Sequence, residues 1–145
     1  MLTKNVKYVD AAGNPVEEEL FFQLTKAEIT EMEYSVKGGL SAMIQKISTT
    51  KDPGTVIAIA KELILKAYGE QYTDAKGIVR FLKNQDIRDA FAATEAYSTL
   101  FMSFVENVDE FNDFIIGIMP LDMQAEIRKA QADGVAPAIE AKGTK

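Results

Sequence analysis

Carboxylates are the side chains of this sequence best suited to chemistry, because the chain contains neither histidine nor cysteine. The densest group is Glu17, Glu18 and Glu19, which follows the turn-like stretch DAAGNP. Paired carboxylates are able to run glycoside hydrolysis. In an extended strand, however, Glu17 and Glu19 point to one side and Glu18 to the other. Charges on an exposed strand ordinarily protect a sheet edge and maintain solubility, and we favour that interpretation over catalysis.

Other motifs that support catalysis or cofactor binding do not occur in the sequence. The stretch DAAGNPVEEEL lacks the D-x-D-x-D-G spacing that wraps calcium, and the glycine turns KGGL and DPGT match no phosphate-binding motif. No serine lies in a G-x-S-x-G elbow. Zinc sites and histidine-based acid–base catalysis lose their usual residues when histidine and cysteine are absent. We therefore expect a protein that is not an enzyme and holds no cofactor or metal.

The charge and hydropathy of the 145 residues limit the classes of partner. The net charge is −6 and the basic residues are diluted, whereas nucleic-acid binding needs concentrated lysine and arginine. The longest apolar run, FIIGIMPL, is far shorter than the ~20 residues that span a bilayer. The start, MLTKNVKYVD, lacks the apolar stretch of a signal peptide. We expect a soluble protein with no nucleic-acid and no membrane partner. An inhibitor that imitates DNA stays an alternative use of the acidic residues.

The first 24 residues predict a β-hairpin. Apolar residues alternate along both halves, with Val6 and Tyr8 in the first and Val16, Leu20 and Phe22 in the second. The stretch DAAGNP between the halves supplies glycine, asparagine and proline for a turn. A lone hairpin is marginally stable in water, so its apolar face must rest on the elements that follow.

The rest of the chain is expected to be mainly helical. Thr25 and Glu28 form a capping-box pattern that begins a helix ending near Ser35, and a second helix is predicted over 40–47. Asp52 and Pro53 begin a third helix, which ends at Gly69. Its expected buried residues are Ile57, Ala60, Ile64 and Tyr68.

The sequence therefore predicts a mainly α fold with an N-terminal β-hairpin. We expect one compact domain over 1–134, followed by a flexible tail at 135–145. Within the domain, the expected parts are the hairpin at 1–24, helices at 25–69, a turn with short extended arms at 70–83 and helices at 84–134.

Two aromatic stripes of helical spacing are expected to build the core. One contains Tyr97, Leu100, Phe101, Phe104, Val105 and Val108, and the other contains Phe111, Phe114, Ile115 and Ile118. Four large apolar residues fall off the predicted core faces. Methionines adapt to varied apolar partners, and grouped exposed apolar residues often mark interaction sites. The hypothesis is that these four bind a partner protein: Phe21, Met102, Ile116 and Met119.

Four segments, which together extend over most of residues 2–123, resemble tail assembly chaperones. They are FFQLTKAEITEME, ELILKAYGE, IRDAFAATEAYSTLFM and FNDFIIGIMP, in that order along the chain. The chain resembles the chaperones of long, non-contractile-tailed phages, or related prophages, of Gram-positive bacteria. The specificity of the resemblance lies in the combination, since no single segment is a catalytic signature.

The resemblance implies a non-enzymatic role in the host cell cytoplasm. Members of the family bind the long, apolar tape measure protein, keep it soluble and help recruit the major tail protein. They are generally absent from the finished virion. The chain resembles the short form, which occurs beside a longer form made by ribosomal frameshifting, and members self-associate, so a homo-oligomer is a further expected partner. The alternative is a structural tail or head–tail completion protein that stays in the virion.

Overall fold

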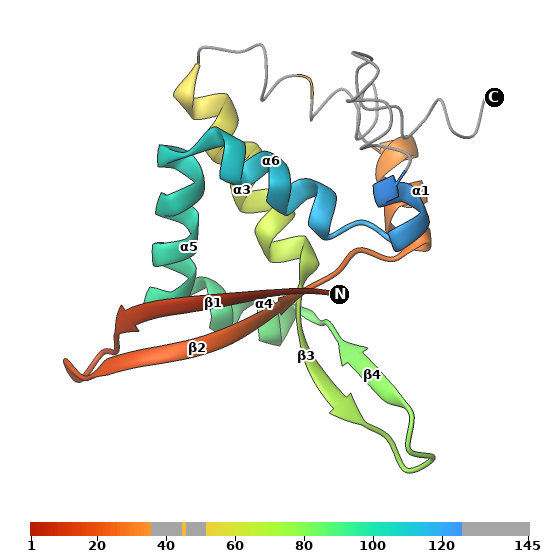
Figure 1. Cartoon of the computed structure of the whole chain (residues 1–145), viewed down its shortest axis with the longest axis horizontal. Coiled ribbons are helices and arrows are strands. Elements are labelled where there is room, and N and C mark those ends of the chain that lie inside the picture. The colour runs from red at the N-terminus through yellow and green to blue at the C-terminus, as the bar shows by residue number, and fades with distance from the viewer. Residues whose placement is uncertain (36–44, 46–51, 126–145) are drawn as a thin grey trace.

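The computed structural model describes residues 1–35, 45 and 52–125 of the chain (Figure 1). The fold is mainly α-helical and carries an N-terminal β-hairpin, as the sequence predicts. The predicted helix at 40–47 and the tail at 135–145 lie outside the described residues, as does the part of the last predicted helix beyond residue 125. The described helices include α1 (Lys26–Ser35), α3 (Pro53–Ala67), α4 (Gln85–Ala92), α5 (Glu95–Glu106) and α6 (Val108–Gly117). Residues 121–125, at the start of the last predicted helix, are helical as well.

The N-terminal hairpin consists of β1 (Leu2–Val9) and β2 (Pro15–Phe22), paired antiparallel along their full length. The Asp10 carboxylate accepts hydrogen bonds from the backbone amides of Ala12 and Asn14, each at 2.9 Å. Gly13 between them has a φ of 90°, which a residue with a side chain rarely adopts. Val6, Leu20 and Phe22 are buried on the face toward the helices, so the predicted alternation is confirmed.

Glu18 lies on the same side of β2 as these apolar residues and has a local partner. The Tyr8 hydroxyl, which stands two positions along the neighbouring strand from Val6, donates a hydrogen bond to the Glu18 carboxylate. This bond, helped by the negative charge of Glu18, raises the pKa of Tyr8 to about 12. The pair satisfies a carboxylate that the alternation of the strand brings toward the apolar side.

The residues predicted as a turn with extended arms form a second hairpin, of β3 (Tyr68–Thr73) and β4 (Val79–Leu82). The sheet has the order β1-β2-β3-β4, but β2 and β3 pair only through Phe21 with Gly69 and Phe22 with Tyr68. Beyond this junction the two hairpins diverge, and β3–β4 extends away from the helices as an arm (Figure 1). The sequence indicates the arm but not its connection to the first hairpin.

The predicted helix starts of α1 and α3 are confirmed. The Thr25 amide donates to the Glu28 carboxylate at 2.9 Å, and the Glu28 amide donates to the Thr25 hydroxyl at 3.1 Å. Asp52 caps α3, with Pro53 at its first position.

The predicted buried face of α3 is partly wrong. Ile57 is 40% exposed, and Tyr68 already belongs to β3 because its backbone is extended. The helix contacts α4 and α5, and these neighbours cover a face that is rotated from the predicted one. The buried residues are Ile59, Ala60, Leu63, Ile64 and Ala67.

Aromatic rings from four elements form the centre of the core. Phe22 of β2 lies edge to face with Phe114 of α6, their ring centroids 5.2 Å apart, and with Phe91 of α4 at 6.1 Å. Phe104 of α5 lies 4.7 Å from Phe114. Most of the two predicted stripes is therefore core, but Val108 is 37% exposed because α5 ends at Glu106 and Val108 begins a new helix.

Candidate docking surface

The structure separates the four predicted partner-binding residues into two groups. Met102 is 46% exposed on α5, and Phe21 is half-buried at the junction of β2 and β3. Ile116 and Met119 are only 4% and 2% exposed, so the prediction that they lie on the surface is wrong. The four residues therefore do not form one exposed surface in this structure.

The burial of Ile116 and Met119 follows from the surroundings of α6. Phe104 of α5 packs against Phe111 and Phe114 on one side of this helix. A Cβ on Gly117 would meet the Leu2 side chain of β1 at 3.1 Å. Just after the helix, the Ile118 carbonyl accepts a hydrogen bond from the Leu24 amide at 2.8 Å. A helix enclosed from several directions buries more than one stripe, and the prediction assumed a single stripe.

The largest concentration of exposed apolar side chains among the described residues lies on the arm. We call its four members the arm patch, and they are 43% to 55% exposed: Tyr72, Ile78, Val79 and Leu82. Because cross-strand partners share a face, the pairing of Glu70 with Leu82 and Tyr72 with Arg80 places Tyr72 and Leu82 together. Val79 lies opposite Thr73 on the other face. Apolar surface is thus presented on both sides of the arm.

The turn at the tip of the arm is held by Asp74. Its carboxylate accepts hydrogen bonds from the amides of Lys76, at 2.8 Å, and Ile78, at 3.0 Å, and Gly77 has a φ of 80°. The Arg80 guanidinium lies 2.9 Å from the same carboxylate. The bond from Arg80, followed by those from the backbone amides, holds the pKa of Asp74 below its ordinary value. The turn is therefore ordered by its own residues.

At the base of the arm, the chain passes closely over Gly69. A Cβ at this position would lie 2.7 Å from the Leu82 carbonyl oxygen and 2.8 Å from the Phe81 ring. Glycine is needed here because two backbone segments approach within a distance that leaves no room for a side chain. The close approach fixes β4 against β3 next to the junction with β2.

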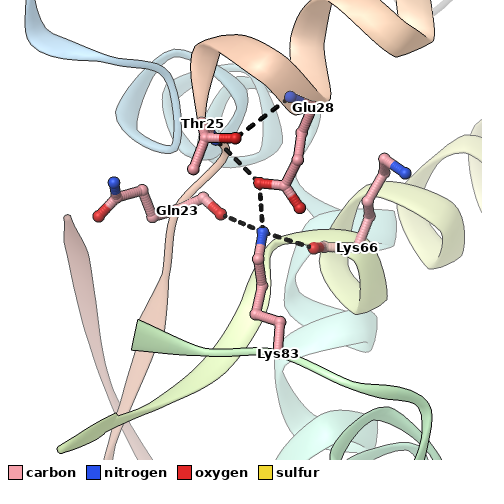
Figure 2. A network of polar contacts seen from close by, with 5 residues as sticks. All are labelled: Gln23, Thr25, Glu28, Lys66 and Lys83. Atoms are coloured by element: carbon pink, nitrogen blue, oxygen red, sulfur yellow. Dashed lines mark hydrogen bonds and ion pairs between the residues drawn. The ribbon is translucent and has the colours of Figure 1, made fainter. Parts of the chain in front are cut away.

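Lys83, the residue after β4, connects the arm to three other elements (Figure 2). Its ammonium donates to the Glu28 carboxylate at 2.6 Å, to the Gln23 carbonyl at 2.9 Å and to the Lys66 carbonyl at 3.2 Å. The Glu28 carboxylate also accepts a hydrogen bond from the Thr25 amide of the capping box. The base of the arm, the end of β2, the start of α1 and the end of α3 therefore meet at one cation.

Burial affects both charges of this network. The Lys83 and Glu28 side chains are 11% and 20% exposed. Loss of solvent lowers the pKa of Lys83, because burial disfavours the charged ammonium. Burial alone would raise the pKa of Glu28, but hydrogen bonds from Lys83 and from the Thr25 amide outweigh it and lower that pKa. The ionised pair is thus held in a partly desolvated site by hydrogen bonds.

The described residues contain neither a cluster of metal ligands nor a helix that could cross a membrane. No group of three or more carboxylates there is placed to hold a metal ion. None of the described helices has the length and hydropathy needed to span a membrane. Of the features described, the arm patch is the one suited to contact with another protein, because its apolar side chains are exposed.

A comparison with known families identifies the chain. Residues 1–144 match the model of a family described as phage tail assembly chaperone. The chain belongs to this family. Neither a curated protein nor a solved structure matches it. Membership of the phage tail assembly chaperone family, which the four sequence segments predict, is thus confirmed, and it gives this chain a role in phage tail assembly.

Sequence reasoning missed the arm patch of this chaperone, although a signal exists. In the stretch IVRFL at 78–82, four of the five residues are large and apolar, directly after a glycine turn. Because neighbouring residues of a strand point to opposite sides, such a run places apolar side chains on both faces of a hairpin. One of these faces is exposed unless helices cover both sides.

Proposed function

We propose that this chaperone binds the tape measure protein, keeps it soluble and helps recruit the major tail protein. The observation that carries the proposal is the arm patch, which presents Tyr72, Ile78, Val79 and Leu82 on a hairpin extending from the body. Contiguous exposed apolar residues on a soluble protein commonly mark a site for another protein. A long apolar client offers the matching surface.

The physical properties of the chain suit a protein that holds an apolar client. Burying a large apolar side chain stabilises a contact by roughly 1.5–3 kcal/mol, so four partly exposed residues give a moderate, reversible affinity. The net charge of −6 limits nonspecific aggregation of unoccupied chaperones through repulsion and so keeps them soluble. The Lys83 network holds the base of the arm, so the patch keeps its orientation without a client.

The wider setting is part of the same proposal. We place the chaperone in the host cell cytoplasm during assembly and outside the mature virion, in a long, non-contractile-tailed phage or prophage of a Gram-positive bacterium. In this account the chain is the short form, acts beside a longer frameshifted form of itself and self-associates. These features rest on the resemblance of the four sequence segments to such chaperones.

Co-expression with the tape measure protein of the same genome tests the proposal. The wild-type chain should keep the tape measure protein in the soluble fraction and co-purify with it. A double variant, Tyr72→Ser with Leu82→Ser, should lose most of this effect. The matched control, Tyr34→Ser with Leu121→Ser, removes two residues that are 90% and 78% exposed away from the arm, and it should behave as wild type.

Two results would contradict the proposal. If the tape measure protein stays insoluble with the wild-type chaperone, the chain does not hold this client. If the arm variant and the control lose the client equally, the arm patch is not the docking site. Mass spectrometry of purified virions separates the structural alternative, because a tail or head–tail completion protein would be present in stoichiometric amounts and a chaperone would not.

A further inference from the structure

A groove of about 340 Å³ runs along β1, on the side of the molecule where α5 packs against this strand. One wall consists of five consecutive residues of β1, at 3–7. Both inward-facing and outward-facing residues are included, so the groove follows the edge of the strand rather than one face. The opposite wall comes from α5 and the first turn of α6 and contains Thr99, Leu100, Ser103 and Glu110.

The backbone of β1 presents unpaired groups along this groove. In an antiparallel pair, alternate residues direct both their N–H and their C=O toward the partner strand. The Asp10 amide donates to the Asn14 carbonyl at 2.9 Å, which places the even-numbered residues of β1 in the bonded positions facing β2. The odd-numbered residues Thr3, Asn5 and Lys7 therefore direct their backbone groups outward, and all three line the groove. Among the described residues, no strand pairs with this edge of the sheet.

The side chains of the groove add a positive bias in an acidic protein. Lys4 and Lys7 are its cations, and Glu110 is the one carboxylate among the described residues that line it. The Lys4 ammonium lies 3.8 Å from Glu110 and 5.8 Å from the centre of the Phe104 ring, which holds it at the wall. Among the described residues that line the groove, one positive charge thus remains in excess, that of Lys7, which lies opposite Glu17 of β2. The hydroxyls of Thr99 and Ser103 supply further polar contacts opposite the strand.

We propose that the groove binds an extended peptide segment carrying a carboxylate, which adds to the outer edge of β1 as a further strand. Outward backbone groups recur every second residue, about 6.6 Å apart, and an extended chain is the ligand whose own N–H and C=O groups repeat at that spacing. The lysines select a carboxylate on the segment by charge. The site is separate from the arm patch, because β1 and β4 are opposite edges of the sheet, and it does not depend on binding of the tape measure protein.

An array of random eight-residue peptides, probed with the full-length chain, supplies the ligand for the test. Peptides that are retained should be enriched in aspartate or glutamate and in β-branched residues. Asn5→Pro removes an outward N–H that β2 does not use, so the fold should tolerate it. This variant should weaken binding of the best labelled peptide by about tenfold or more in fluorescence anisotropy. Asn5→Ala keeps the N–H and should bind within about twofold of wild type.

Two further measurements make the test independent of the proline. A peptide N-methylated at the residues that face β1 should lose binding to the unchanged protein, because methylation removes the strand-forming donors. Lys7→Gln should weaken acidic peptides by about threefold to fivefold and reduce their dependence on salt. The arm variant with Tyr72→Ser and Leu82→Ser should bind the peptide as wild type does, which keeps this result distinct from failure of the client proposal.

Three outcomes would overturn the inference. The array could retain no peptide above background, or Asn5→Pro and the N-methylated peptide could bind as tightly as their parents. Sedimentation could instead show that the wild-type chain is a dimer that Asn5→Pro converts to a monomer. In that last case a second copy of the chain, rather than a peptide of another protein, occupies the edge of β1.

Discussion

The Lys83 ammonium lies 2.6 Å from the carboxylate of Glu28, a residue 55 positions earlier in the chain. The contact joins the base of the β3–β4 arm to the capping box of α1. It is nonlocal, and the same ammonium also satisfies carbonyls at the ends of β2 and α3. The position of the arm relative to the body is therefore set at this cation as well as at the pairing of β2 with β3. Changes at Lys83 should affect both stability and client binding.

Replacing Lys83 by methionine should destabilise the chain by about 2 kcal/mol. The variant keeps most of the apolar stem but removes the donor to the Gln23 and Lys66 carbonyls and the positive charge beside Glu28, which among the described residues retains only the hydrogen bond from the Thr25 amide. Unpaired buried groups are costly. Urea unfolding measures the change. Lys76→Met, in the exposed turn of the arm, is the control and should stay within about 0.5 kcal/mol of wild type. Equal stability of the two variants would show that the network contributes nothing.

The stability of the chain should fall in acid partly through Glu28. Its pKa is lower in the folded chain than in the unfolded chain, so its contribution is complete above the ordinary glutamate pKa of about 4.3. That contribution is lost as the pH falls through the lower folded value. Lys83 has its effect at alkaline pH. Burial lowers its pKa in the folded chain, so the free energy of unfolding rises as the pH rises through that lowered pKa.

Urea unfolding at a series of pH values from 7 to 3 checks the acid dependence. Glu28→Gln should be less stable than wild type at pH 7, and the difference should shrink toward pH 3. Glu31→Gln removes an exposed carboxylate from the same helix and serves as the control. A difference between wild type and Glu28→Gln that stays constant over the whole range would contradict the assignment.

Gly69→Ala should destabilise the chain by about 2 kcal/mol or more. The added methyl group would lie 2.7 Å from a backbone oxygen of β4, and backbone does not move aside as cheaply as the end of a side chain. Thermal unfolding followed by circular dichroism measures the loss. The control is Gly54→Ala in the first turn of α3, where the nearest atom is a side-chain oxygen at 3.4 Å. Its stability should match or exceed that of wild type, because alanine favours the helix.

Ile116→Ser and Met102→Ser should differ sharply in stability. Ile116 of α6 is buried, so the loss of its side chain and the burial of a hydroxyl should cost about 3 kcal/mol or more. Met102 is 46% exposed, and its substitution should stay within about 0.5 kcal/mol. Comparable stability of the two variants would place Ile116 on the surface, where the sequence pattern put it.

Local rules predicted much of this fold from the sequence. The turn at Gly13, the capping box of Thr25 and Glu28, and the start of α3 at Pro53 depend on residues within four positions of one another. Such contacts are readable because residue type and spacing determine them directly. The same is true of the aromatic stripes of α5 and α6, whose period is helical.

The remaining features depend on contacts between distant segments. The period of α6 indicates one buried stripe, but Leu2 and Leu24 approach the end of this helix from elsewhere in the chain, so Ile116 and Met119 are buried as well. Likewise, the pairing of Phe21 with Gly69 across 48 positions joins the two hairpins and leaves the arm free beyond the junction. The arm patch was therefore missed, because the exposure of Tyr72 and Leu82 depends on which layers the rest of the fold supplies.

Photo-crosslinking from position 72 tests the central claim most directly. The chaperone would carry a benzoyl-phenylalanine in place of Tyr72, be co-expressed with the tape measure protein and be irradiated, with mass spectrometry of the products. The same group in place of Tyr34, which is 90% exposed at the end of α1, is the control. The account predicts crosslinks to apolar segments of the tape measure protein from position 72 and few from position 34. Strong crosslinks from position 34 with none from position 72 would contradict it.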